Sequence, residues 1–108
     1  MRVHPAIIEG TEEILSAAKL VGLDKIDYDK KYTLFKTEAK NKSTTGIPDD
    51  GYIDRGNVYI IGNEKQSALY LMNHDSWFKT SQVLSCEPIE LGYRVETNNS
   101  IYELRVVI

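Results

Sequence analysis

The residues that could carry catalysis are few and widely separated in the sequence. The chain has one cysteine, Cys86, and two histidines, His4 and His74. Covalent catalysis needs a nucleophile with a base in hydrogen-bonding reach, and a structural zinc site needs clustered cysteine and histidine ligands. The sequence holds neither pattern, and the pair His74–Asp75 is its one acid–base combination of neighbours. The sequence therefore favours a protein that is not an enzyme and that uses no cofactor or metal.

Three aspartates lie close together around Gly51. Asp49, Asp50 and Asp54 are carboxylates of the kind that Mg²⁺ and Ca²⁺ prefer. Their spacing does not match a calcium-binding loop, which ends on a glutamate, so turn formation explains them better. A small metal-dependent hydrolase or nuclease that uses these aspartates, His74 or Asp75 stays open as an alternative.

Lysines and threonines precede these aspartates in the same polar stretch. Lys40 and Lys42 are followed by Thr44 and Thr45, whose hydroxyls could cradle an anion together with backbone amides. Phosphate contacts by these residues and by Arg55, with tyrosines stacked on bases, would make a sponge for a nucleotide-like anion. This small-ligand sponge is the other alternative function.

The aromatic residues give the more informative pattern. The chain has seven tyrosines and one tryptophan, more than so small a core is expected to hold. Tyr59 and Tyr70 fall on opposite arms of a predicted hairpin and are expected to share a face. Tyrosine and tryptophan are favoured in binding patches because they bury large areas and keep a polar group. The sequence thus predicts a binding surface that includes Tyr52, Tyr59, Tyr70, His74 and Trp77.

Length and charge limit the class of protein. A chain of 108 residues and 12.3 kDa is expected to form one domain, residues 1–108. Its formal charge of −3 argues against binding to duplex nucleic acid, which draws much of its affinity from basic residues. No apolar run approaches the roughly 18 residues that span a bilayer, and the lone cysteine suits a reducing compartment. We therefore expect a cytoplasmic protein with no membrane partner.

Residues 11–21 are predicted to form an amphipathic helix, the first element. Thr11 is the expected N-cap, Ile14 and Ala18 lie on the apolar face, and Gly22 is expected to adopt a left-handed conformation after the helix. Residues 38–54 are predicted to form a long polar loop. Residue alternation and turn signals predict strands over 32–37, 57–61, 68–72, 93–97 and 101–107, with a longer strand or a bent pair over 77–86.

These elements predict an α+β fold. One N-terminal helix precedes five or six short strands with no crossover helix, so an antiparallel sheet or a small barrel is the economical arrangement. On the last strand, Tyr102, Leu104 and Val106 are expected to face the core, with Val95 across the closing hairpin. Cys86 lies in an alternating stretch and is expected to pack as a small hydrophobic residue.

The C-terminal part of the chain carries a recurring arrangement of residues. The stretch from Trp77 to Val83 spells W-x-x-T-S-x-V, and Gly92 to Leu104 spells G-x-x-V-x-T-x-N-S-x-Y-x-L. This part resembles the ends of small β-rich accessory proteins that bacteriophages and mobile elements encode. The resemblance covers roughly the last quarter of the chain and implies no catalytic residues. It implies an accessory protein that acts in a bacterial cytoplasm and inhibits or redirects a host or defence component.

The leading hypothesis is a non-enzymatic binding module. Its tyrosine-rich sheet surface and the 38–54 loop are expected to hold a host or defence protein, or a second copy of the chain as a homo-oligomer. The sponge and the small hydrolase or nuclease described above remain its alternatives.

Overall fold

The computed structural model describes residues 1–5, 7, 10–39, 52–62 and 66–107. Within them lie one α-helix, α1 (Thr11–Leu20), one 3-10 turn, η1 (Leu23–Lys25), and seven strands. The strands are β1 (Tyr32–Ala39), β2 (Tyr52–Gly62), β3 (Ser67–Met72), β4 (Trp77–Lys79), β5 (Val83–Ile89), β6 (Gly92–Thr97) and β7 (Ser100–Val106). No helix among the described residues is both long and apolar enough to span a bilayer.

All the described strands form one open antiparallel sheet, in the order β4-β3-β2-β1-β7-β6-β5. The α+β class with one N-terminal helix is confirmed. The predicted number of strands is corrected from five or six to seven, and the small barrel is wrong because the sheet does not close. It stays open because β4 is only three residues long and has no ladder with β5, the strand at the opposite edge.

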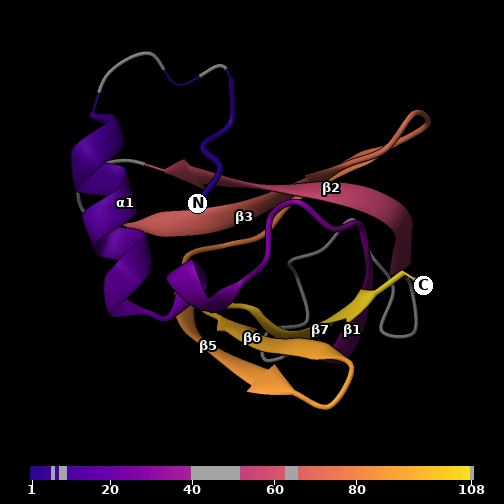
Figure 1. Ribbon diagram of the computed structural model, residues 1–108. Coiled ribbons are helices and arrows are strands. Elements are labelled where there is room, and N and C mark those ends of the chain that lie inside the picture. Colours follow the sequence, from indigo (N-terminus) through magenta and orange to yellow (C-terminus); the bar gives the residue numbers. More distant parts are fainter. Residues whose placement is uncertain (6, 8–9, 40–51, 63–65, 108) are drawn as a thin grey trace.

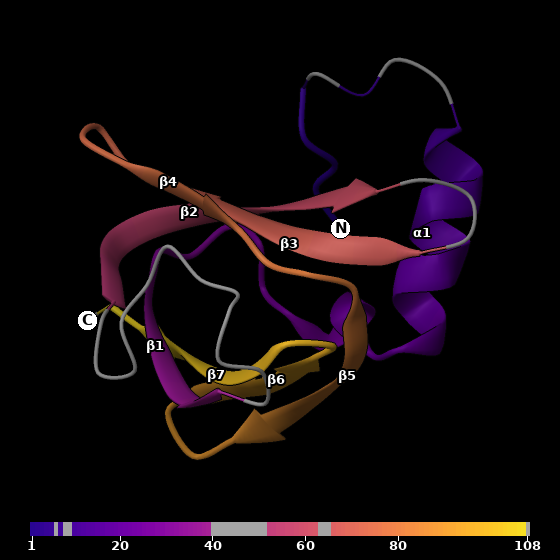
Figure 2. The ribbon, with the colours of Figure 1, turned by 180° about the vertical axis from the view of Figure 1, so that it is seen from behind.

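The extra strand comes from a break within residues 77–86. The buried Thr80 divides this stretch. Its hydroxyl accepts a hydrogen bond from the backbone N–H of Leu69 at 3.0 Å and donates one to the backbone carbonyl of Ser81 at 2.8 Å. These bonds end β4 beside β3, and the chain then crosses to the other half of the sheet as β5 (Figure 2). Of the two predicted forms, the bent pair is the observed one.

The sheet curls so that its two halves face each other. Figure 1 shows β2 bending, with β2 and β3 above and β5, β6 and β7 below. The register between β1 and β2 shifts between Tyr32 and Leu34, and Arg55 in β2 has a positive φ of 54°, an irregularity of the kind that bends a strand. The core lies between the halves, and α1 packs against β2 and β3 at one end. Its largest fully buried side chains include Tyr32, Leu34, Ile60, Leu69, Leu71, Tyr102 and Leu104.

The helix begins one residue earlier than the predicted cap implies. Thr11 is already helical, and Gly10 holds the N-cap position in a left-handed conformation with no side-chain cap. Ile14 and Ala18 are buried as predicted. Gly22 is left-handed with φ 88°, also as predicted.

The closing hairpin agrees with the sequence prediction. Val95 pairs with Tyr102 across β6 and β7, and Val95, Tyr102 and Leu104 are buried while Val106 is partly buried against the core. The two ends of the predicted 38–54 loop, residues 38–39 and 52–54, are corrected to strand, since β1 runs to Ala39 and β2 begins at Tyr52. Residues 40–51 lie outside the described residues.

Candidate functional site

The outer face of β2, β3 and β4 carries a row of aromatic side chains. Tyr59 lies directly opposite Tyr70 in the β2–β3 ladder, so both side chains point to the same face. Trp77 on β4 stacks on Tyr70, with ring centroids 5.6 Å apart and planes 13° from parallel. Trp77 is 64% exposed. Because all three strands alternate, their inner faces still supply the core through Val58, Ile60, Leu69 and Leu71.

A histidine from the N-terminal segment completes this row. The His4 ring packs edge-on against Tyr70 at 4.4 Å and against Tyr59 at 5.7 Å between centroids. Backbone pairing beside Val3 holds it there: the Ile60 N–H donates to the Arg2 carbonyl at 2.7 Å, and the His4 N–H donates to the Ile60 carbonyl at 2.9 Å. We refer to His4, Tyr59, Tyr70 and Trp77 as the aromatic strip.

The exposed tryptophan is fixed by the turn that precedes it. The Asn73 side-chain oxygen accepts hydrogen bonds from the backbone N–H groups of Asp75 and Ser76 at 2.9 and 2.8 Å. The Asn73 N–H donates to the Ser76 carbonyl at 2.9 Å, which closes the turn. Such side-chain bonds hold asparagine turns rigid. Trp77 therefore projects from a short strand held by this turn at one end and by Thr80 at the other.

Positive charge borders the aromatic strip. Lys79 pairs with Tyr70 across β3 and β4, so its exposed side chain starts on the same outer face. The Arg2 guanidinium lies 5.9 Å from the Tyr59 ring centroid, a cation–π distance. Arg2 also pairs with the exposed Asp29 at 3.0 Å. The strip thus offers flat apolar rings next to a cation, the combination enriched at protein-binding hot spots.

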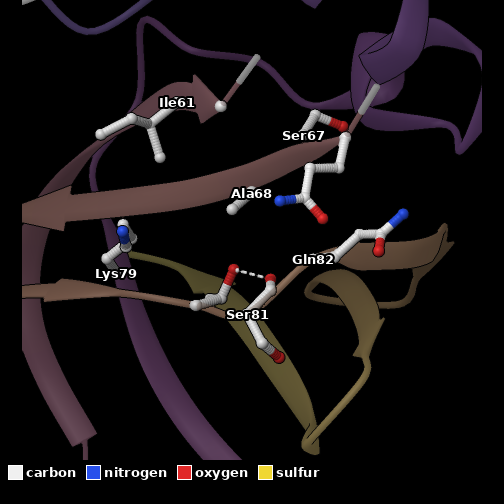
Figure 3. A pocket seen from close by; sticks show the side chains of 9 residues that line it. Ile61, Ser67, Ala68, Lys79, Ser81 and Gln82 are labelled. Atoms are coloured by element: carbon white, nitrogen blue, oxygen red, sulfur yellow. Dashed lines mark hydrogen bonds between the residues drawn. The ribbon is translucent and has the colours of Figure 1, made fainter. Parts of the chain in front are cut away.

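A polar pocket lies where β4 ends and β3 continues. This cavity, which we call the edge pocket, has a volume of about 360 Å³. Figure 3 shows residues of β2 and β3 on one side and residues of the β4–β5 connection on the other. Its lining mixes a lysine, hydroxyls and side-chain amides with two apolar residues, and includes Ile61, Ser67, Ala68, Lys79, Ser81 and Gln82. Lys79 therefore belongs both to the edge pocket and to the border of the aromatic strip.

A second pocket lies at the far end of the sheet, near the β5–β6 turn. It has a volume of about 480 Å³, and Leu91 at its rim is 61% exposed. Its charges are mixed in sign, with Lys30 and Arg105 beside Asp27 and Glu90. Lys30 lies 3.9 Å from Asp27, and Arg105 pairs with Glu103 at 2.9 Å. This pocket has partly buried tyrosine surface but no row of exposed rings.

The structure brings together part of the predicted binding surface. Tyr59, Tyr70 and Trp77 lie side by side, and His74 is exposed in the turn just before Trp77. Arg55 is exposed in β2 at the bend and lies outside the strip. Tyr52 begins β2, but its side chain is outside the described residues, as are the loop residues Lys40, Lys42, Thr44 and Thr45.

Sequence reasoning missed three members of this surface. Arg2 and His4 reach it through one parallel bridge between Val3 and Ile60, a pairing that leaves no periodic signal in so short a segment. Lys79 could have been found, because it stands two residues after Trp77 and strand alternation places both on one face.

Cys86 and His4, a candidate nucleophile and a candidate base, lie apart. Cys86 is buried in the core between the sheet halves, whereas His4 sits on the outer face against Tyr59 and Tyr70. Burial raises the pKa of the Cys86 thiol to about 12, so the thiolate needed for attack is not the resting form at neutral pH. In the described part of the chain, no three His, Cys, Asp or Glu side chains group in a way that could hold a metal ion.

Comparisons with protein families, with curated proteins and with solved structures found no match to this chain.

Proposed function

We propose that the protein is a small non-enzymatic binding module that holds a protein partner on the aromatic strip. The observation that carries this proposal is the exposed Trp77 stacked on Tyr70, with Lys79 opposite Tyr70 and Arg2 near the neighbouring Tyr59. Tryptophan, tyrosine and arginine are the residue types that dominate binding energy in protein interfaces. A surface ring held by a neighbouring ring loses little conformational entropy on binding, which favours affinity.

The partner class follows from the resemblance of the C-terminal pattern to phage accessory proteins. In that setting the protein would act in the bacterial cytoplasm and bind a host or defence protein, inhibiting it. The overall charge of −3 agrees with a protein partner rather than with duplex nucleic acid.

Capture of partners from a bacterial lysate tests this proposal. Immobilised wild-type protein is compared with Trp77→Ala and with Leu20→Ala, a matched control in which an 88% exposed apolar side chain is removed from α1, away from the strip. We expect the same protein to be retained by the wild type and by Leu20→Ala and to be lost with Trp77→Ala. Equal retention by the wild type and both variants would argue against binding through the aromatic strip.

The sponge and hydrolase alternatives are separated by thermal unfolding. A ligand that binds the folded state raises the unfolding temperature as its concentration exceeds its Kd. We expect no rise with mononucleotides or with Mg²⁺. A rise with micromolar nucleotide would favour the anion sponge, and a rise with Mg²⁺ together with nucleotide hydrolysis would favour the metal-dependent enzyme.

A further inference from the structure

The β4 strand ends the sheet with an open edge. Among the described elements, β4 contacts only β3 and β2. The opposite edge strand, β5, is better protected: a methyl group on Gly22 would lie 2.5 Å from the Cys86 carbonyl oxygen, so the chain passes directly against that strand. Pro88 also removes one N–H donor from β5. The unpaired N–H and C=O groups of an open edge are a template for pairing with another strand.

The hydrogen bonds of the β3–β4 hairpin show which backbone groups face this open edge. The Asn73 N–H donates to the Ser76 carbonyl, and the Thr80 N–H donates to the Leu69 carbonyl. Hydrogen-bonded pairs alternate along an antiparallel ladder, so Phe78, which lies opposite Leu71, turns its backbone groups toward β3. The N–H and C=O groups of Trp77 and Lys79 consequently face away from the sheet.

These two residues are complementary to each other. If a second β4 pairs antiparallel about a twofold axis at Phe78, Trp77 of each copy lies opposite Lys79 of the other, and each such pair exchanges both of its backbone hydrogen bonds. Their side chains share the outer face, which sets an ammonium group beside an indole ring, an attractive cation–π arrangement. A twofold interface must be self-complementary in this way.

The same register also brings an acidic side chain of one copy to hydrogen-bond donors of the other. Continued past Trp77, it carries Asp75 of one copy toward Ser81 of the other, at the edge pocket. That pocket is lined by hydrogen-bond donors of Lys79, Ser81 and Gln82, and Asp75 is exposed at the tip of its turn. An aspartate carboxylate accepts hydrogen bonds from donors of these kinds, and the lysine adds opposite charge.

We infer that two copies of the chain pair through the open edge of β4, antiparallel about a twofold axis at Phe78, with the β3–β4 turn of each copy seated against the edge pocket of the other. The two β4 strands would join the two sheets into one, with both aromatic strips on its outer face. This inference stands on the edge geometry and does not require the proposed protein partner.

Sedimentation equilibrium over a series reaching millimolar protein tests the pairing. We expect the mass to rise from 12.3 kDa toward twice that value. Lys79→Pro should abolish the rise because it removes an N–H that faces the open edge and leaves the hydrogen bonds to β3 in place. Lys79→Glu should also abolish it, because it puts a carboxylate beside Trp77 and Asp75 of the second copy. Lys79→Arg and Leu20→Ala should keep it.

Two results would overturn the pairing. One is a mass of 12.3 kDa at every concentration. The other is a dimer that survives Lys79→Glu, particularly one that is lost instead with Leu91→Ser at the second pocket. Circular dichroism of each variant shows whether it is folded, and if Lys79→Pro does not fold, Lys79→Glu against Lys79→Arg decides the question. Partner capture with Lys79→Arg runs separately, so the proposed function can fail without affecting this result.

Discussion

At the scale of single residues, buried ionisable groups are expected to make the fold less stable at alkaline pH. Burial raises the pKa of the Cys86 thiol to about 12 and raises the pKa of the Tyr28 hydroxyl, which donates to the Leu23 carbonyl at 2.7 Å. In the unfolded chain these groups ionise at their ordinary pKa values of 9.0 and 10.0. Above about pH 9 the unfolded state therefore releases protons that the folded state retains, and folding becomes less favourable.

Urea denaturation from neutral pH to about pH 11 should thus show a free energy of unfolding that is constant below about pH 9 and falls above it. Cys86→Ala should reduce the first part of the decline, since the thiol is then absent. A free energy that stays level across the whole range would mean that these groups are not protected from ionisation.

A glycine contact gives a second prediction at this scale. Gly22 has φ 88°, and an added Cβ would lie 2.5 Å from the Cys86 carbonyl oxygen. Gly10 also has a positive φ, 73°, but its nearest neighbour would be 3.9 Å away. Both Gly→Ala changes strain the backbone by about 1 kcal/mol, and Gly22→Ala must in addition displace β5. We expect Gly22→Ala to lower the free energy of unfolding by at least roughly 2 kcal/mol more than Gly10→Ala; equal losses would contradict the close packing.

At the scale of elements, the closing hairpin of β6 and β7 has one face in the core and one face outward. Leu104 is fully buried on β7, while its neighbour Glu103 faces outward and pairs with Arg105. Leu104→Ala should lower the free energy of unfolding by about 2–5 kcal/mol, as emptying a core leucine site does. Glu103→Ala should cost less than about 1 kcal/mol, because it removes only a partly exposed ion pair. Chemical denaturation that ranks them in the reverse order would show that the strand faces are assigned wrongly.

The alternation of apolar and polar residues along the strands gave most of the correct predictions about the elements. It placed Tyr59 with Tyr70 and Val95 with Tyr102, because a period of two fixes the face of every strand residue. It left open whether residues 77–86 form one strand or a bent pair, and it did not locate the break at Thr80, whose side chain bonds to Leu69 on a strand that only folding brings near. Nor did it predict the position of His4, which depends on one bridge between Val3 and Ile60.

At the scale of the whole molecule, the two faces of the curled sheet carry different sets of side chains. Its inner faces and α1 form the core, while the outer face of β2, β3 and β4 is left to the aromatic strip. The sequence indicated a tyrosine-rich surface, but the location of that surface depended on which strands became neighbours. The strand order was not encoded in local periodicity, since β7 pairs with β1 from the other end of the chain.

The affinity of the captured partner protein for strip variants tests the central claim most directly. Titration calorimetry compares the wild type, Trp77→Ala, Tyr70→Ala and Leu20→Ala, each checked for folding by circular dichroism. Truncating a ring at the centre of an interface costs about 2 kcal/mol or more, roughly thirty-fold in Kd. We predict losses of that size for Trp77→Ala and Tyr70→Ala and none for Leu20→Ala. A folded Trp77→Ala variant that binds the partner with the wild-type Kd would contradict the account.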